Sequence, residues 1–241
     1  MSGDNKVEGI FKFSDCTRWQ TLPIQSFELE IAGNGGNYKY ELGIKHKGGK
    51  SHVEYERLWF DNQLILKFEF GDVLLYKDDY SKGAKYSFDW SQSILSSLMP
   101  RSDNTKITWF KQPMERFIIV QIIPSLMVDG SKKEETKLTD KMENYVSWYR
   151  YLSQVRGKVA DLMNNLKQVL DGFVSLKFDS FNEESRTLKF RFSESANSAK
   201  IIDYRFGELS DGQKVLIALY TLLYCTQSED YTLCIDEPEN F

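Results

Sequence analysis

The sequence predicts a mixed α/β fold (α+β in arrangement), in which an antiparallel β-rich lobe precedes a helical subdomain and a small α/β core. Residues 27–88 alternate apolar and polar side chains between short turns, which is the pattern of antiparallel hairpins. Residues 93–180 carry apolar side chains at helical spacing. The stretch 205–241 joins an apolar helical segment to a short apolar run that ends in carboxylates. We therefore expect three regions, 1–92, 93–180 and 181–241.

The composition is typical of a soluble globular protein, with 41% hydrophobic and 27% charged residues among 241. The net charge of −4 argues against a whole-surface attraction to nucleic acid, and leaves a local basic patch open. No apolar stretch approaches twenty residues and no signal peptide is recognisable, so we expect a cytoplasmic protein without a membrane partner. The three cysteines and two histidines show no metal-ligand spacing.

The β-rich lobe is expected to be a meander of hairpins with acidic and basic residues on its open face. Gly, Asp and Asn mark its turns, because these residues tolerate the backbone angles of tight hairpins. A further short strand is expected at 10–13. The meander strands are expected at 27–31, 38–44, 53–60, 64–70, 73–76 and 86–88.

Gly49-Lys50-Ser51 resembles the end of a phosphate-binding P-loop. That pattern requires a glycine at position 44, which is isoleucine in this sequence. A P-loop also opens a helix, whereas the residues from Val53 to Glu56 alternate like a strand. We therefore interpret Gly49-Lys50-Ser51 as part of a hairpin turn.

The middle of the chain is expected to be mainly helical. A short helix is predicted at 91–98, and 107–123 is apolar at helical spacing, with Pro113 forcing a break or a start. Residues 129–140 form a charged loop, and 144–173 predicts one long amphipathic helix. Strands are expected to follow at 174–178, 187–192 and 200–206.

The residues Gly207 to Gln213 run into an apolar helix expected at 215–224. Ser210 is a good N-cap, and an acidic residue at 211 complements the helix dipole. The free N–H groups of such a terminus can bind phosphate, and Gly212 lets an anion approach the backbone. Alone, this pattern is more often a simple helix cap.

The run Tyr231–Ile235 predicts a buried strand that delivers two carboxylates at its carboxyl end, where ligands bind in open α/β sheets. Asp236 is placed to hold Mg²⁺ through its water shell, and Glu237 to polarise an attacking water. Pro238 stops the strand. Alone, this pattern is often only a strand that leaves the core.

Together, in this order and spacing, the two patterns resemble the signature and Walker B motifs of ABC-type ATPases, in the group of RecF, SMC/Rad50 and OLD-like ATPases often called AAA-family. Leu209–Gln213 stands for the family's LSGGQ, with aspartate at 211 in place of one glycine. Residues 235–240 stand for Walker B. The specific motifs cover 205–241 only. The family's Walker A is expected upstream of this chain and its switch histidine downstream, so the chain by itself is expected to be inactive.

The resemblance implies an ATP- and Mg²⁺-dependent ATPase that works as a homodimer, with two heads sandwiching two nucleotides. It also allows a DNA or effector/nuclease partner and a role in DNA repair or phage defence. The family's Q-loop glutamine is expected early in the chain, at Gln20 or Gln25. The implied site residues are Glu237 as the catalytic group, Asp236 at the metal, and Ser210, Asp211, Gly212 and Gln213 at the nucleotide held by the other head.

Two other functions stay open at the level of the sequence. One is a catalytically silent dimerisation or interaction module, which the missing Walker A favours. The other is a nuclease that uses Asp236, Glu237 and Glu239 as metal ligands, since clustered carboxylates can bind two metals. The neighbouring signature-like loop argues against the nuclease.

Overall fold

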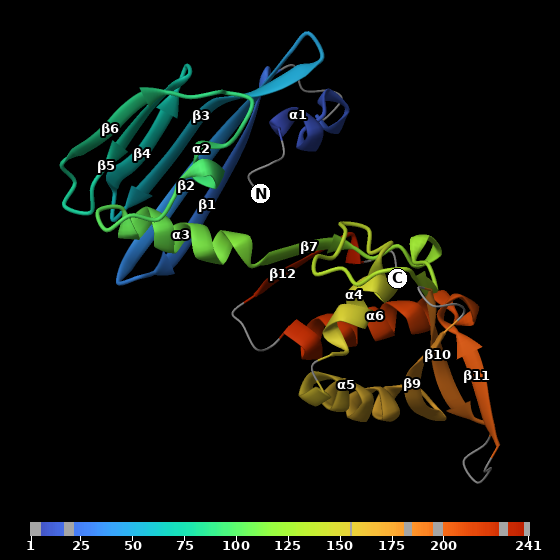
Figure 1. Cartoon of the computed structure of the whole chain (residues 1–241). Helices are drawn as coiled ribbons and strands as arrows, with labels where there is room; N and C mark the ends of the chain where they lie inside the picture. The colour runs from blue at the N-terminus through green and yellow to red at the C-terminus, as the bar shows by residue number, and fades with distance from the viewer. Residues whose placement is uncertain are drawn as a thin grey trace. The chain divides into compact units, whose positions relative to one another are not determined.

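The structure is a computed structural model that describes residues 6–16, 22–154, 156–180, 185–194, 200–226 and 231–238. The chain forms two compact units, Met1–Glu115 and Arg116–Phe241 (Figure 1). The mixed α/β class is confirmed, with a large antiparallel sheet in the first unit and helices packed on smaller sheets in the second. The boundary between the units differs from the region boundaries expected at 92 and 180.

The first unit contains a six-stranded antiparallel meander whose strands follow one another in chain order, as predicted. Each strand pairs with the next through a tight connection (Figure 1). The strands are β1 Ile24–Gly33, β2 Gly36–Lys47, β3 Lys50–Phe60, β4 Gln63–Glu69, β5 Asp72–Tyr76 and β6 Lys82–Ser87.

Four of the hairpins turn through two residues with positive φ, which matches the right-handed twist of the flanking strands. Asn, Asp and Gly fill these positions at little cost, and Phe70 is the exception among them. The turn at Gly48 and Gly49 leads from β2 directly into β3, so the hairpin interpretation of Gly49-Lys50-Ser51 is confirmed. The four pairs are Asn34–Gly35, Gly48–Gly49, Asp61–Asn62 and Phe70–Gly71.

One face of the meander is apolar and packs against helices, because the strands alternate. In β2, Tyr38, Tyr40 and Leu42 are buried, while Lys39 and Glu41 between them point the other way. The helices on this apolar face are α2 Ile94–Ser97 and α3 Thr105–Glu115, with α1 Val7–Ile10 and the 3-10 turn η1 Phe13–Asp15 near the end of β3.

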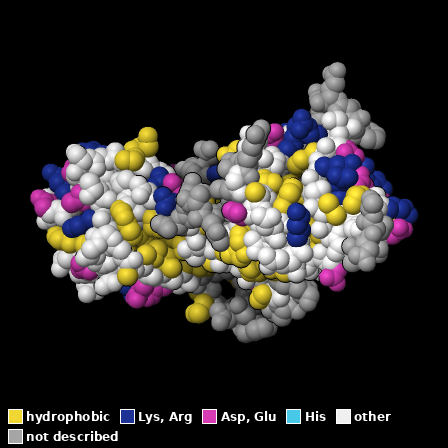
Figure 2. Space-filling view, turned by 90° about the horizontal axis from the view of Figure 1, so that it is seen from below, with side chains coloured by type: hydrophobic (Ala, Val, Ile, Leu, Met, Phe, Trp, Pro, Cys, Tyr) yellow, Lys and Arg dark blue, Asp and Glu magenta, His cyan; other side chains and the backbone are white. Residues whose placement is uncertain are grey.

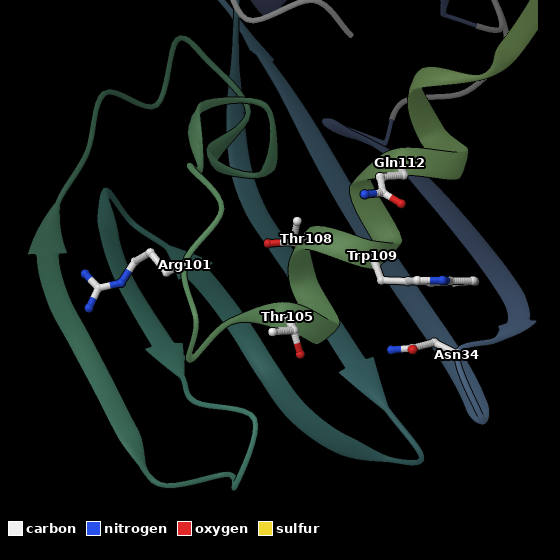
Figure 3. A pocket seen from close by; sticks show the side chains of 6 residues that line it. All are labelled: Asn34, Arg101, Thr105, Thr108, Trp109 and Gln112. Atoms are coloured by element: carbon white, nitrogen blue, oxygen red, sulfur yellow. The ribbon is translucent and has the colours of Figure 1, made fainter.

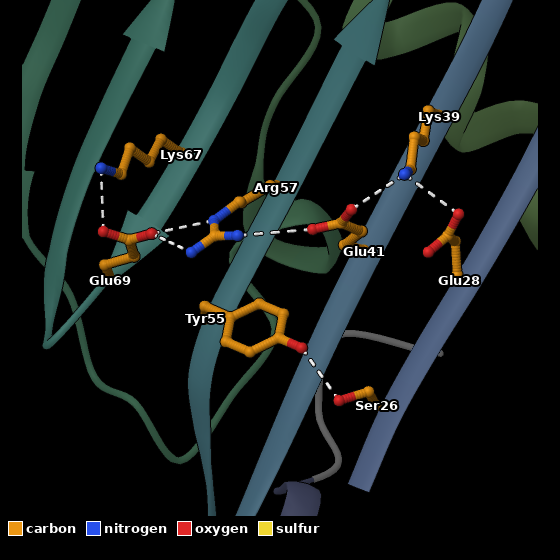
Figure 4. A network of polar contacts seen from close by, with 8 residues as sticks. All are labelled: Ser26, Glu28, Lys39, Glu41, Tyr55, Arg57, Lys67 and Glu69. Carbon is orange, nitrogen blue, oxygen red and sulfur yellow. Dashed lines mark hydrogen bonds and ion pairs between the residues drawn. The ribbon is translucent and has the colours of Figure 1, made fainter. Parts of the chain in front are cut away.

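The open face carries a chain of ion pairs across four strands, which confirms the predicted charged face (Figure 4). Lys39 lies 3.0 Å from a carboxylate oxygen of Glu28 and 3.1 Å from one of Glu41. Arg57 links Glu41, at 3.4 Å, to Glu69. Acids and bases thus alternate along the face, so their charges neutralise one another.

Three predicted elements of the first unit need correction. The strand expected at 10–13 is instead the end of α1 and the start of η1. The helix expected at 91–98 is the shorter α2, capped by Ser93, whose side chain accepts a hydrogen bond from Ser96. Pro113 neither starts nor breaks α3, because it lies in the last turn, two residues before the helix ends.

In the second unit, helices cover one face of an antiparallel sheet. The order β11-β10-β8, with β9 on β10, gives a core of Leu188 and Phe190 against Tyr145, Leu162 and Ile217. The elements of this layer are β8 Gly130–Ser131, β9 Phe173–Ser180, β10 Arg186–Ser193, β11 Ile201–Arg205, η2 Pro124–Leu126, η3 Phe206–Glu208, α4 Tyr145–Leu152, α5 Arg156–Val169 and α6 Asp211–Thr226.

The single helix predicted at 144–173 is wrong. The chain forms α4 and α5 instead, and α4 is capped at Ser153, whose N–H donates to the carbonyl of Tyr149. Residue 155, which the predicted apolar stripe included, lies outside the described residues. Part of the apolar stripe is confirmed, because Val146, Leu162 and Leu166 are buried, but Val169, which it also included, is 39% exposed.

The helical interpretation of 107–123, which placed a break or a start at Pro113, is wrong in its second half, where the chain forms the strand β7 Phe117–Gln121. β7 pairs in parallel with β12 Thr232–Asp236, residue for residue. A buried strand was predicted at 231–235; the strand is present at 232–236, but its predicted burial is wrong, since Leu233 is 41% exposed. In β7, Val120 is buried, whereas Ile119 on the opposite face is 63% exposed. Among the described residues, the face of the two-stranded sheet that carries Ile119 is therefore uncovered.

Candidate functional site

The first component of the site is the loop that opens α6. The Oγ of Ser210 accepts a hydrogen bond from the backbone N–H of Gln213 at 3.3 Å. In return, the Oε1 of Gln213 accepts one from the N–H of Ser210 at 3.0 Å. This reciprocal arrangement is a capping box, so the predicted N-cap at Ser210 is confirmed. It also gives Gln213 a structural role at the helix terminus.

The first turn of α6 is open to an approaching anion. A Cβ placed on Gly212 would meet nothing within 4 Å, so that part of the backbone is uncovered. Asp211 is highly exposed, and its carboxylate lies 3.6 Å from the ammonium of Lys214. The whole side chain of Lys214 is only 10% exposed, so its ammonium is largely shielded and lies beside Asp211 at the helix terminus.

The loop before the helix is fixed by its own contacts. Glu208 accepts a hydrogen bond from the N–H of Arg205 at 2.7 Å and pairs with its guanidinium at 3.1 Å. Both bonds lower the pKa of Glu208 below its usual value, and the bond from the backbone N–H of Arg205 contributes most. Phe206 and Leu209 are buried in the core on either side. The signature-like loop is thus held on a rigid base.

The second component lies at the carboxyl end of β12. Asp236 is the last residue of the strand, and it stands opposite Gln121, the last residue of β7. Glu237 follows with a positive φ of 50°. A non-glycine residue in that region costs about 1–2 kcal/mol, so the chain leaves the strand conformation here at a free-energy cost. The turn places the two carboxylates at the end of the parallel pair.

The side chain of Gln121 was missed by the sequence reasoning and belongs to this component. Its Nε2 donates a hydrogen bond to Oε2 of Glu237. By contrast, Gln25 lies on β1 in the first unit, where its Oε1 bonds His46 at 2.7 Å, and Gln20 lies outside the described residues. The signal for Gln121 was the β-branched run before it, which the helical interpretation of 107–123 concealed.

The two components come from elements that run in opposite directions. Figure 1 shows that α6 and β12 run antiparallel, so the amino end of α6 and the carboxyl end of β12 lie toward the same side of the second unit. Within the described residues, the hydrogen bonds and ion pairs join Ser210 to Gln213, Asp211 to Lys214 and Glu237 to Gln121.

The carboxylate end supplies oxygen donors suited to a hard cation. Asp236, Glu237 and the amide oxygen of Gln121 are of the type that Mg²⁺ prefers in proteins, where it keeps several waters and takes one or two carboxylates. In the described parts of the chain, no three His, Cys, Asp or Glu side chains form a metal-binding group. Glu239, the third carboxylate of the nuclease hypothesis, lies outside the described residues.

The first unit has a shallow pocket of about 270 Å³ beside α3 (Figure 3). Two of its polar side chains already have partners within the unit. Thr105 bonds Asp78 at 2.7 Å, and the amide of Asn34 donates to the hydroxyl of Tyr38 at 2.9 Å. Figure 3 shows Arg101 directed away from the ring of Trp109, so the lining groups do not converge on one point.

In comparisons with known proteins, no protein-family model, curated protein or solved structure matches the chain.

Across the described residues, the longest apolar helices fall short of what a membrane-crossing helix requires.

Proposed function

We propose that this chain supplies the signature and Walker B elements of an ABC-type ATPase related to the RecF, SMC and OLD-like group. The observation that carries the proposal is the pairing of an open, capped helix terminus at Ser210–Gln213 with two carboxylates at the end of a parallel strand. Each half has a simple structural explanation alone. Their occurrence in one compact unit, in the family's order, supports the family assignment.

At the carboxylate end, the roles follow from position. Asp236 continues the strand and faces the place where ligands bind in parallel sheets. Glu237 comes one residue later, past the backbone reversal, so its carboxylate is placed to accept a proton from an attacking water. Mg²⁺, when bound, would neutralise charge on the phosphates. Gln121 holds the Glu237 carboxylate in place, and we assign to it the part of the family's Q-loop glutamine.

At the helix terminus, Ser210 and Gly212 would contact the phosphates of a nucleotide held by a second copy. The uncovered backbone at Gly212 and the helix dipole favour a negative charge there. Lys214 adds a cation beside this terminus, and its ion pair with Asp211 offsets part of the negative charge that Asp211 presents to a phosphate. This arrangement supports a homodimer in which each signature loop acts across the interface.

The chain has no GxxxxGK[ST] segment, so the proposed site needs a phosphate loop from another segment. The edge of β12 that faces away from β7 has no strand beside it within the described residues. Parallel sheets are normally covered on both faces and extended by further strands. We therefore expect the strand that carries the phosphate loop to pair with this edge of β12.

The test is ATP hydrolysis by the full-length protein. Glu237→Gln should keep ATP binding and slow hydrolysis by about two to four orders of magnitude, the usual contribution of a positioned acid–base group. A closed dimer should then accumulate in the presence of ATP and be visible by size-exclusion chromatography. Asp236→Asn should instead weaken Mg²⁺ and nucleotide binding together, because it removes charge next to the metal.

Glu41→Gln serves as the matched control, since it removes one carboxylate from the open face of the first unit and leaves the site intact. It should hydrolyse ATP at the wild-type rate. A wild-type rate in Glu237→Gln, or no ATP hydrolysis by the wild type, contradicts the proposal. The latter outcome would favour the silent dimerisation module, which needs a fold but no turnover.

A further inference from the structure

The six-stranded meander has a free edge on each side. β1 and β6 are its outermost strands, and among the described residues no further strand pairs with either (Figure 1). A free edge presents unpaired N–H and C=O groups that can bind a strand of another chain. Neighbouring strands are antiparallel throughout, so β1 and β6 run in opposite directions. A second copy in the same orientation would therefore bring its β6 antiparallel to β1, with both open faces on one side.

On β1, the outward backbone groups belong to residues with acidic side chains. The carbonyl of Pro23 accepts a hydrogen bond from the N–H of His46 at 3.2 Å, so Pro23 and every second residue after it bond to β2. Glu28 and Glu30 fall between these residues and direct their own N–H and C=O groups away from the sheet. Their side chains are exposed on the open face, where Glu28 pairs with Lys39 and Glu30 forms no ion pair within the described residues.

On β6, two lysines occupy the corresponding side of the sheet. The N–H of Phe88 donates to the carbonyl of Gly71 at 2.8 Å, so alternate residues from Phe88 bond to β5, and Lys85 directs its backbone groups outward. Lys85 lies on the open face, and the irregular register at residues 83 and 84 keeps Lys82 on that face as well. Both lysines are exposed, and in the part of the chain that the structure describes neither forms an ion pair. β6 thus offers basic side chains where β1 offers acidic ones.

One register brings the two charged edges into contact. When Lys85 of one copy is opposite Glu28 of the next, the outward backbone groups of both strands face each other and can form hydrogen bonds. The same register puts Lys82 beside Glu30, across the irregular residues of β6. Opposite charges across a strand pair stabilise it, and like charges destabilise it. Pairing of β1 with β1, or of β6 with β6, would face acid with acid or lysine with lysine, so the charges favour the unlike edges.

The apolar side of the sheet agrees with that register, which places Phe27 of β1 opposite Tyr86 of β6. Both rings lie on the apolar face, because Phe27 is opposite the buried Leu42 and Tyr86 is opposite the buried Val73. In a single copy these rings are 42% and 37% exposed. Aromatic pairs across neighbouring strands stabilise a sheet, and this pair would remove apolar surface from water.

The charges elsewhere on the chain offer no comparable attraction between copies. On the face shown in Figure 2, Lys and Arg side chains form separate groups with Asp and Glu side chains close by. In the second unit, for example, Lys177 is paired with Asp203 at 2.6 Å and Lys189 with Asp179 at 2.7 Å. Such pairs neutralise each other, so the complementary charge is concentrated at the two edges of the meander.

We propose that copies of this chain associate edge to edge, with β6 of one copy paired antiparallel to β1 of the next. Each added copy again leaves one β1 and one β6 free, so the interface is heterologous and the assembly grows with concentration. β6 has six residues and an irregular register, which limits the number of hydrogen bonds and makes the association reversible. The association needs no nucleotide, which separates it from the ATP-dependent homodimer proposed above.

The experiment is sedimentation equilibrium of the whole chain without nucleotide, at protein concentrations up to about 1 mM. The average mass of the wild type should rise with concentration. Glu30→Lys and Lys82→Glu/Lys85→Glu each place like charges across the interface and should raise the dissociation constant by about tenfold or more. An equimolar mixture of the two variants should recover a 1:1 complex, because the unchanged β1 of one variant can pair with the unchanged β6 of the other.

The matched control is Glu194→Lys, which reverses an exposed carboxylate of the second unit and changes the net charge as Glu30→Lys does. It should associate like the wild type. Tyr86→Ser, which changes no charge, should weaken association, and circular dichroism verifies that each variant keeps its fold. A wild type that stays monomeric, or that associates only with ATP, overturns the proposal. So does equal weakening by Glu194→Lys, unchanged association of the edge variants, or a mixture no heavier than its components.

Discussion

At the scale of single residues, the most constrained side chain of the first unit is Glu56. It is fully buried, and its carboxylate accepts hydrogen bonds from the hydroxyls of Tyr40 and Ser93, both at 2.8 Å. The N–H groups of Ile94 and Leu95 also donate to it, at 2.8 and 3.3 Å. One carboxylate on β3 thus satisfies the first turn of α2 and fastens that helix to the sheet.

Glu56→Ala should destabilise the protein by about 3–5 kcal/mol, because it leaves buried donors without an acceptor. Burial raises the pKa of Glu56 above its usual 4.5, although its four donors pull in the other direction. A raised folded-state pKa gives stability that is complete below pH 4.5 and is lost as pH rises through the folded-state value. The difference between wild type and Glu56→Ala should therefore be largest at acid pH.

Urea unfolding of both proteins at pH 4 and pH 8 measures that difference. Glu28→Ala is the control, since Glu28 makes only an exposed ion pair with Lys39 and its removal should cost below ~1 kcal/mol. A Glu56→Ala protein as stable as the control at both pH values would show that the four hydrogen bonds contribute little.

At the scale of elements, substitutions in the capping box of α6 distinguish its contribution to stability from its proposed contact with phosphate. Ser210→Ala should cost about 1 kcal/mol of unfolding free energy, the usual loss at an N-cap. Ser210→Asp keeps a capping oxygen but adds a negative charge where the proposal places phosphate. It should be close to wild type in stability while weakening ATP-driven dimerisation. Thermal unfolding measures the change in stability, and size-exclusion chromatography with ATP measures dimerisation. A Ser210→Asp protein that dimerises as well as Ser210→Ala would contradict a phosphate contact at Ser210.

The elements also show where sequence reasoning succeeds. The meander followed from local information: alternation in strands such as β2, and turn residues such as Asn34 and Gly35 at positions of positive φ. The capping box was equally local, since Ser210 and Gln213 are three residues apart. Fold class and helix terminus could therefore be predicted from the sequence alone.

The failures concern contacts between distant residues. β7 was predicted as helix because its partner β12 lies more than a hundred residues later, and the pairing decides between strand and helix for a short apolar run. The same pairing brings Gln121 to Glu237, which no local pattern indicated. The break between α4 and α5 was hidden because apolar spacing continues across it.

At the scale of the whole molecule, the chain contains only part of what tight nucleotide binding needs. The uncovered terminus of α6 offers a few N–H groups and Lys214, and the end of β12 offers carboxylates that repel ATP in the absence of a cation. In P-loop proteins the phosphates are cradled by a glycine-rich loop and its lysine, and this sequence has neither.

The 241-residue chain by itself should therefore bind ATP weakly, with a Kd of about 1 mM or more, which corresponds to roughly −4 kcal/mol. Isothermal titration calorimetry with Mg²⁺ present measures this, and the full-length protein is the comparison. Micromolar affinity in this chain would mean that a complete phosphate site exists within it. In that case Gly49-Lys50-Ser51 would be the first place to mutate, since Lys50→Ala would then remove ATP binding.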